Sequence, residues 1–219
     1  DPYNRRLNSQ IGFVYELLGE SKKAEEIFLE GILKNNDSFE CLNALVNYHA
    51  NNSRPNKAKY YLDELLRLRP NDNRVMRTAS NYYFKNNDFD NSKKYLLKIK
   101  KLNSRDKIDL AFIEKKSRNN VQASKYLNEA KIQLDNWANN NEQSAPPRYH
   151  LSKIYIMNGD FDKAFELLDS MASLGGLHYK SLMSNPHFDI ISNNPRYFRL
   201  IDMIKTIIDR ERIEAGLVS

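Results

Sequence analysis

The sequence has little of several residue types, and each shortage excludes a class of protein. Its 219 residues include one cysteine, Cys41, so neither a disulfide framework nor a zinc site built from thiolates is expected. With 7 glycines and 7 prolines, it has too few of either for a fibrous or low-complexity chain. No apolar run approaches the roughly 18 residues that a membrane-spanning helix needs. The composition that remains predicts a globular chain, long enough for one large domain or two small ones.

The chain also lacks an initiator methionine and an apolar segment of the kind that a signal peptide carries. We therefore expect it to be a piece of a longer protein, and its single reduced cysteine is compatible with a cytoplasmic location. The formal net charge is +6, an excess that bears on solubility more than on the choice of partner. Asparagine, by contrast, is abundant, with 27 residues, many of them in pairs.

An internal repeat of about 34 residues is the most informative pattern in the sequence. A turn signal is followed about five residues later by a small residue, and four residues after that by a large apolar one. Apolar residues recur at helical spacing on both sides of each turn, which predicts stacked units of helix, tight turn and helix. The turn signals are Gly19, Asn52-Ser53, Asn87, Asn119-Asn120 and Gly159; the small residues are Ala24, Ala58, Ser92, Ala123 and Ala164; the large ones are Phe28, Leu62, Leu96, Leu127 and Leu168.

This spacing resembles the tetratricopeptide repeat, most clearly in the first unit, which reads Ile11-Gly12, Tyr15, Ala24, Phe28 and Gly31. The resemblance implies an all-α fold: a right-handed superhelix, or α-solenoid, of about five helical hairpins with a C-terminal helical cap. The fourth hairpin is degenerate, and we expect its first helix, over about 106–116, to be short. The predicted units are 5–38, 39–72, 73–106, 104–137 and 145–178.

Two segments depart from the repeat. Residues 138–147 are polar and end in two prolines, which predicts an exposed loop or hinge, with Trp137 packed at the end of the preceding helix. Residues 179–219 are predicted to cap the solenoid with helices that start at Pro186 and Pro195, each after an asparagine, the last one running to about Glu214. This tail also resembles the C-terminal ends of multi-domain bacterial repeat proteins, in which the repeats follow a signalling domain.

Groups that carry catalysis are sparse, so we predict neither an enzyme nor a cofactor or metal site. The four histidines show no metal-ligand spacing. His49 stands at the tyrosine-like packing position of the second unit and is expected in the core, whereas His178 and His187 are expected at the surface. Cys41 has no nearby basic residue to activate it and is expected to be buried.

The family resemblance implies instead a concave groove, lined by the first helix of each unit, that holds an extended peptide. Asparagine can donate to and accept from a peptide backbone at once, and arginine can bind a carboxylate through two hydrogen bonds. Lys115 and Lys153 would extend a positive field that suits an acidic or C-terminal segment. The predicted binding residues are Asn43, Asn47, Arg74, Arg77, Asn81, Phe84, Lys115, Tyr149 and Lys153, and the other groove positions are Arg6, Ser9, Phe13, Glu16, Glu40, Ala50, Ile108, Phe112 and Ile156.

The hypothesis is thus a non-catalytic scaffold for a protein or peptide partner, or for a neighbouring domain of the same chain. One alternative is a regulatory or sensory tail of a bacterial signalling enzyme or transcription regulator. Another is self-association through the capping helix or an exposed convex face, which would give a homo-oligomer. Nucleic acid is a less favoured partner, because the basic run Lys93–Lys101 is also typical of a solvated outer helix face.

Overall fold

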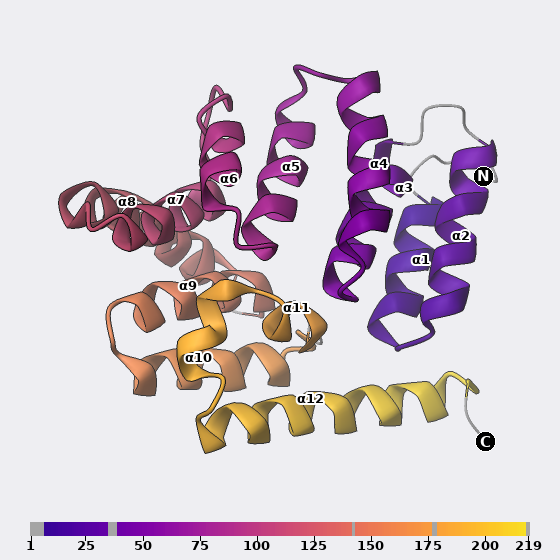
Figure 1. Ribbon diagram of the computed structural model, residues 1–219. Coiled ribbons are helices and arrows are strands. Elements are labelled where there is room, and N and C mark those ends of the chain that lie inside the picture. The colour runs from indigo at the N-terminus through magenta and orange to yellow at the C-terminus, as the bar shows by residue number, and fades with distance from the viewer. Residues whose placement is uncertain (1–6, 35–38, 142, 177–178, 218–219) are drawn as a thin grey trace. The chain divides into compact units, whose positions relative to one another are not determined.

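The computed structural model describes residues 7–34, 39–141, 143–176 and 179–217, and the regular elements in these ranges are all helices (Figure 1). Consecutive helices pair as hairpins, from α1 with α2 to α9 with α10. The all-α helical repeat predicted from the sequence is therefore confirmed. The elements are α1 (Leu7–Leu17), α2 (Ser21–Lys34), α3 (Phe39–Asn51), α4 (Pro55–Leu68), α5 (Asn73–Lys85), α6 (Phe89–Leu96), α7 (Ser104–Lys116), α8 (Asn120–Asn140), α9 (Ala145–Met157), α10 (Phe161–Ser173), α11 (Tyr179–Met183), the 3-10 helix η1 (Pro186–Ile191) and α12 (Pro195–Glu214).

The same tight turn joins the two helices of each hairpin. One residue of the turn lies in the left-handed region, with φ between 55° and 81°. Its N–H donates to the carbonyl three positions back, and the next N–H donates to the carbonyl five positions back at 2.8–3.0 Å. This pair of bonds is a Schellman motif, which satisfies carbonyls that the helix end leaves open. The left-handed residues are Gly19, Ser53, Asn87, Arg118 and Gly159, so each predicted turn is present, the fourth one residue earlier than its asparagine pair.

The small residues at the start of each second helix allow the two helices of a hairpin to approach closely. Ala24, Ala58, Ser92, Ala123 and Ala164 are all fully buried. In the first hairpin the approach is closest at Gly12, where an added Cβ would lie 2.3 Å from a ring carbon of Phe28. The repeated pattern of small and large residues is thus the packing pattern of the hairpin.

The chain forms two compact units. The first comprises Asp1–Lys98 together with Ile207–Ser219, and the second comprises Ile99–Thr206. The predicted hinge at 138–147 is not where the units divide. Helix α8 continues to Asn140, and α9 begins at Ala145 with its prolines in the first turn, where the missing N–H needs no partner. The connection between α8 and α9 is therefore much shorter than expected.

The helix lengths differ from expectation in the third and fourth hairpins. Helix α7 has 13 residues, so the expected short first helix is wrong. It starts early because Asn103 and Asp106 form a capping box, in which each side chain accepts a hydrogen bond from the other's backbone N–H. The shortest helix of these two hairpins is instead α6, with 8 residues.

In the C-terminal region, η1 and α12 begin at the predicted prolines, each after an asparagine. Asn185 Oδ1 accepts a hydrogen bond from the His187 N–H ahead of η1, and Asn194 Oδ1 accepts one from the Arg196 N–H at the start of α12. Helix α12 buries Tyr197, Leu200, Ile201, Ile204 and Ile208.

Three of the single-residue predictions are settled by burial. His49 and Cys41 are fully buried, as expected, whereas His187 is 1% exposed and its predicted surface position is wrong. Trp137, at the end of α8, is 41% exposed, and His178 lies outside the described residues.

Candidate functional site: a polar ladder between two first helices

The candidate site is a row of polar side chains that joins α3 to α5 in the first unit. Asn81 Nδ2 donates to Asn47 Oδ1 at 2.8 Å. One turn earlier the Thr78 hydroxyl donates to Asn43 Oδ1, and one turn later Lys85 Nζ donates to Asn51 Oδ1. The partners in these rungs are 34 or 35 residues apart, so each rung links equivalent positions of successive repeats. We call these six residues the polar ladder.

The ladder extends at the carboxyl end of α3 to the first hairpin. Asn51 Nδ2 donates to Glu16 Oε1 of α1 at 3.3 Å, across the same repeat spacing. Asn51 therefore connects the first helices of three successive hairpins. Such cross-repeat bonds fix the register of one first helix against the next.

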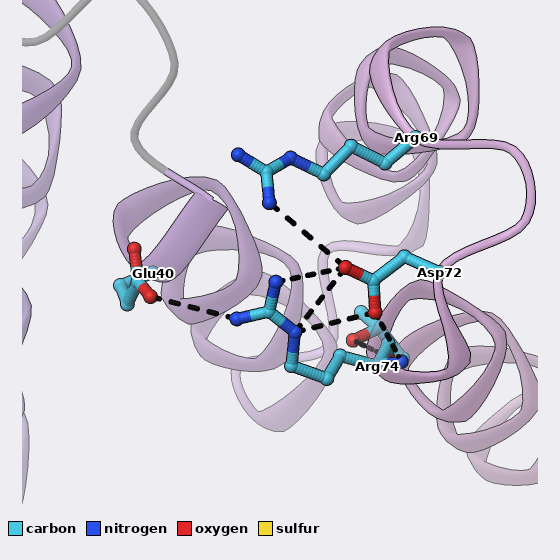
Figure 2. Close-up of polar contacts among 5 residues, drawn as sticks. Glu40, Arg69, Asp72 and Arg74 are labelled. Carbon is cyan, nitrogen blue, oxygen red and sulfur yellow. Dashed lines mark hydrogen bonds and ion pairs between the residues drawn. The ribbon is translucent and has the colours of Figure 1, made fainter.

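At the amino end of α5, charged residues hold Arg74 in place (Figure 2). Its guanidinium lies 2.8 Å from Asp72 and 3.7 Å from Glu40 of α3, and it stacks on the Phe39 ring at 4.1 Å. Asp72 also accepts the Arg74 backbone N–H as the N-cap of α5, and Arg69 approaches it at 3.9 Å. The side-chain hydrogen bond from Arg74 holds the pKa of Asp72 below its usual range. Arg74 is therefore an organising residue rather than an open carboxylate receptor.

The central amides of the ladder keep hydrogen-bonding capacity. An asparagine side chain offers two N–H donors and two acceptor lone pairs. Asn47 uses one donor on the Asn43 carbonyl and one acceptor site on Asn81, and Asn81 uses one donor on Asn47. Both side chains are only half-buried, so solvent reaches them. The rung can thus both donate to and accept from a bound backbone.

The structure removes one residue from the predicted binding set and adds three residues to it. Phe84 is 1% exposed and packs edge-to-face on Phe89 of α6, so it belongs to the core of its hairpin. The residue that continues the row after Asn81 is Lys85, four positions on, because 3.6 residues complete a turn. Thr78, Asn51 and Lys85 lie beyond the predicted set. The signal that finds Asn51 is the four-residue spacing of Asn43, Asn47 and Asn51 within one helix.

The remaining predicted binding residues, Arg77 and three residues of the second unit, lie outside the polar ladder. Arg77 is half-buried on α5, one turn from both Arg74 and Asn81. Lys115 Nζ donates to the Met157 carbonyl at the end of α9, where a cation also complements the helix dipole. Lys153 is 3% exposed, and Tyr149 is half-buried against Phe188. Each of these three therefore already contacts another part of the second unit.

An ionic cluster in the first unit joins the buried His49 to exposed basic residues and supports the hairpins rather than a site. Glu25 of α2 lies 3.6 Å from His49, 3.5 Å from Arg54 and 3.3 Å from Lys57. Burial lowers the pKa of His49, which stacks on Tyr61 at 5.5 Å. His49 is therefore a neutral core residue at neutral pH.

Two further features bear on function. Across the described ranges, none of the helices combines the length and the apolar character that crossing a membrane would require. In those same ranges, no three His, Cys, Asp or Glu side chains gather as metal ligands would.

The chain is similar to known repeat proteins in fold. Residues 151–176, from the middle of α9 to just after α10, match the model of the PPR repeat. The structure of PilF from Pseudomonas aeruginosa is 15% identical, covers 94% of this chain and 90% of its own, and superposes with a TM-score of 0.54. A tetratricopeptide repeat protein from Parabacteroides merdae is 14% identical, covers 94% of this chain and 86% of its own, and gives a TM-score of 0.53. No curated protein matches the sequence.

Proposed function

The chain has the fold of tetratricopeptide repeat proteins, and from this premise we propose that it is a non-catalytic scaffold whose polar ladder binds an extended peptide of a partner protein. The observation that carries the proposal is the Asn47–Asn81 rung, which keeps donors and acceptors in a half-buried position. A peptide backbone offers the complementary groups at every residue.

The spacing of the ladder suits an extended chain. Asn43, Asn47 and Asn51 follow one another at four-residue steps along α3. Each step rises about 6 Å along a helix, and two residues of an extended peptide advance about 6.6 Å. Successive amides would therefore meet every second residue of a peptide that runs along α3 and α5.

Charged groups lie at both ends of the ladder. Arg74 is held by Asp72 and Glu40 at the amino end of α5, and Lys85 Nζ donates to Asn51 Oδ1 at the other end. The Asn47–Asn81 rung between them carries the proposed contacts with the peptide backbone.

The experiment selects peptides from a random display library on the immobilised full chain and measures their affinities by calorimetry. We expect the double variant Asn47→Ala/Asn81→Ala to bind a selected peptide about tenfold more weakly or worse. Replacing both partners of the rung avoids leaving one amide unpaired, so the loss of stability stays small. The matched control is Asn56→Ala, an exposed asparagine in the first turn of α4.

The control variant should bind like the unmodified chain, and both variants should keep its circular dichroism spectrum. If the selected peptides bind the double variant and the unmodified chain equally, the ladder is not the binding site.

A further inference from the structure

In the second unit, the face of α7 and α9 where the sequence predicts a groove is covered by a segment of the same chain. His187 of η1 donates through Nε2 to Asp109 Oδ1 of α7 at 2.9 Å, since a carboxylate can only accept. The His187 ring also lies 4.7 Å from Phe112, and Phe188 lies 5.5 Å from the Tyr149 ring of α9. Two predicted groove positions, Phe112 and Tyr149, thus each contact the turn.

The covering turn, residues 185–191, has two unlike sides. Pro186, His187, Phe188 and Ile191 point into the unit and are buried. Ile190, by contrast, is 69% exposed. The neighbouring imidazole and phenyl rings contact side chains of α7 and α9, so we take them as the recognition elements of the turn.

The surface beneath the turn carries two charged groups, Lys153 and Asp109, beside the Phe112 and Tyr149 rings. Lys153 Nζ lies 4.6 Å from the Tyr149 ring centroid and 6.0 Å from that of Phe188. Burial lowers the pKa of Lys153 to about 8. Burial would raise the pKa of Asp109, but the hydrogen bond from His187 and the charge of Lys153 outweigh it, so this pKa is lowered. The turn therefore keeps an ammonium and a carboxylate away from water.

We propose that the inner face of α7 and α9 is a second ligand site, which takes a turn carrying adjacent imidazole and phenyl rings after a proline, and that residues 185–191 occupy it as a ligand in cis. Partner segments with the same Pro-His-Phe chemistry then compete with the chain's own turn. This site is separate from the polar ladder, and neither proposal depends on the other.

The charged groups beneath the turn reduce the cost of releasing it. Release exposes Pro186, Phe188 and Ile191 to water and breaks the His187–Asp109 hydrogen bond, and both effects are unfavourable. The same step rehydrates Asp109 and Lys153, and recovered hydration of buried charges offsets much of that loss. An apolar interface of equal size would lack this compensation.

The test measures the acetylation rate of Lys153 in the full chain by mass spectrometry, with the exposed Lys125 of α8 as internal reference. We expect the double variant His187→Ala/Phe188→Ala to raise this rate at least about tenfold relative to Lys125. The matched control Ile190→Ala changes only the outward side of the turn and should leave the rate unchanged.

The decisive step adds a synthetic peptide of residues 183–193 in trans to the double variant. Protection of Lys153 by this peptide, but not by the same peptide with alanine at the two ring positions, would establish the site. Equal effects of the two peptides, or no protection by either, would overturn it.

Hydrogen exchange of the unmodified chain tests the proposal even if the double variant does not fold. A ligand in cis opens independently of the helices that hold it, so the amides of 187–191 should exchange faster than those in the middle of α9. Equal protection in both segments would show that the turn is an inseparable part of the core.

Discussion

At the scale of single residues, the predicted groove residues have different roles because their neighbours differ. Asn47 shares a rung with Asn81 and keeps spare hydrogen-bonding groups. Arg74 is held by Asp72, Glu40 and the Phe39 ring. Lys153 is buried beside Phe188. Residue type therefore suggests binding chemistry, but contacts decide whether that chemistry is available to a ligand.

His187 makes the stability of the second unit depend on pH. Burial lowers its pKa from 6.5 to about 4. Between these values the unfolded chain binds a proton that the folded chain does not, so the stabilisation is complete above about pH 6.5 and is lost as the pH falls toward 4. The full difference is on the order of 3 kcal/mol.

Urea unfolding at several pH values, followed by Trp137 fluorescence, checks this prediction within the second unit. The variant His187→Gln has no proton to gain in this range and should show a flatter profile. A variant profile as steep as that of the unmodified chain would contradict the role of His187.

At the scale of elements, each hairpin depends on a Schellman turn and on a close approach next to it. Five turns share the same pair of backbone hydrogen bonds although the left-handed residue varies among glycine, serine, asparagine and arginine. Glycine reaches this region at little cost, whereas Ser53 and Arg118 carry a Cβ there. The packing of the hairpin therefore holds these two turns in a conformation that their residue types disfavour.

The substitution Gly12→Ala tests the close approach in the first hairpin. The new Cβ would lie 2.3 Å from the Phe28 ring, so α1 and α2 must move apart or the ring must leave its rotamer. We expect a loss of about 1–3 kcal/mol in the free energy of unfolding. Urea titrations followed by circular dichroism measure it, with Gln10→Ala as a control at an exposed position of the same helix.

Repeating the substitution in a Phe28→Leu variant distinguishes the steric clash with Phe28 from the change in helix propensity. In a chain that carries Phe28→Leu, the smaller side chain leaves room, so Gly12→Ala should be less destabilising than in the unmodified chain. Equal losses in the two backgrounds would show that Phe28 is not the cause.

At the scale of the whole molecule, the chain divides into two compact units between residues 98 and 99 and again between 206 and 207. In repeat proteins each hairpin contacts mainly its neighbours, so stability is approximately a sum of local terms. The one tryptophan, Trp137, lies in α8 and reports the second unit, whereas circular dichroism reports helices throughout.

We therefore expect Gly12→Ala, in the first unit, to lower the urea midpoint seen by circular dichroism more than the midpoint seen by Trp137 fluorescence. If both midpoints fall equally, the two units unfold as one cooperative body.

The sequence alone determined the features that depend on local patterning. The helical hairpins, the five turns, the asparagine caps at Pro186 and Pro195 and the burial of Cys41 and His49 all follow from a 3.6-residue period and from turn chemistry. These signals lie within a few residues of one another, so they can be recognised without the fold.

Only the tertiary structure decided which of the predicted groove residues are buried and what each one contacts. A shift of one residue turns a side chain by about 100° around the helix, which separates Phe84 in the core from Lys85 on the ladder. The burial of His187 depends on Asp109, 78 residues away, and the rungs depend on partners about 34 residues away. Contacts at such separations arise from the packing of one helix against another, and a local pattern does not specify them.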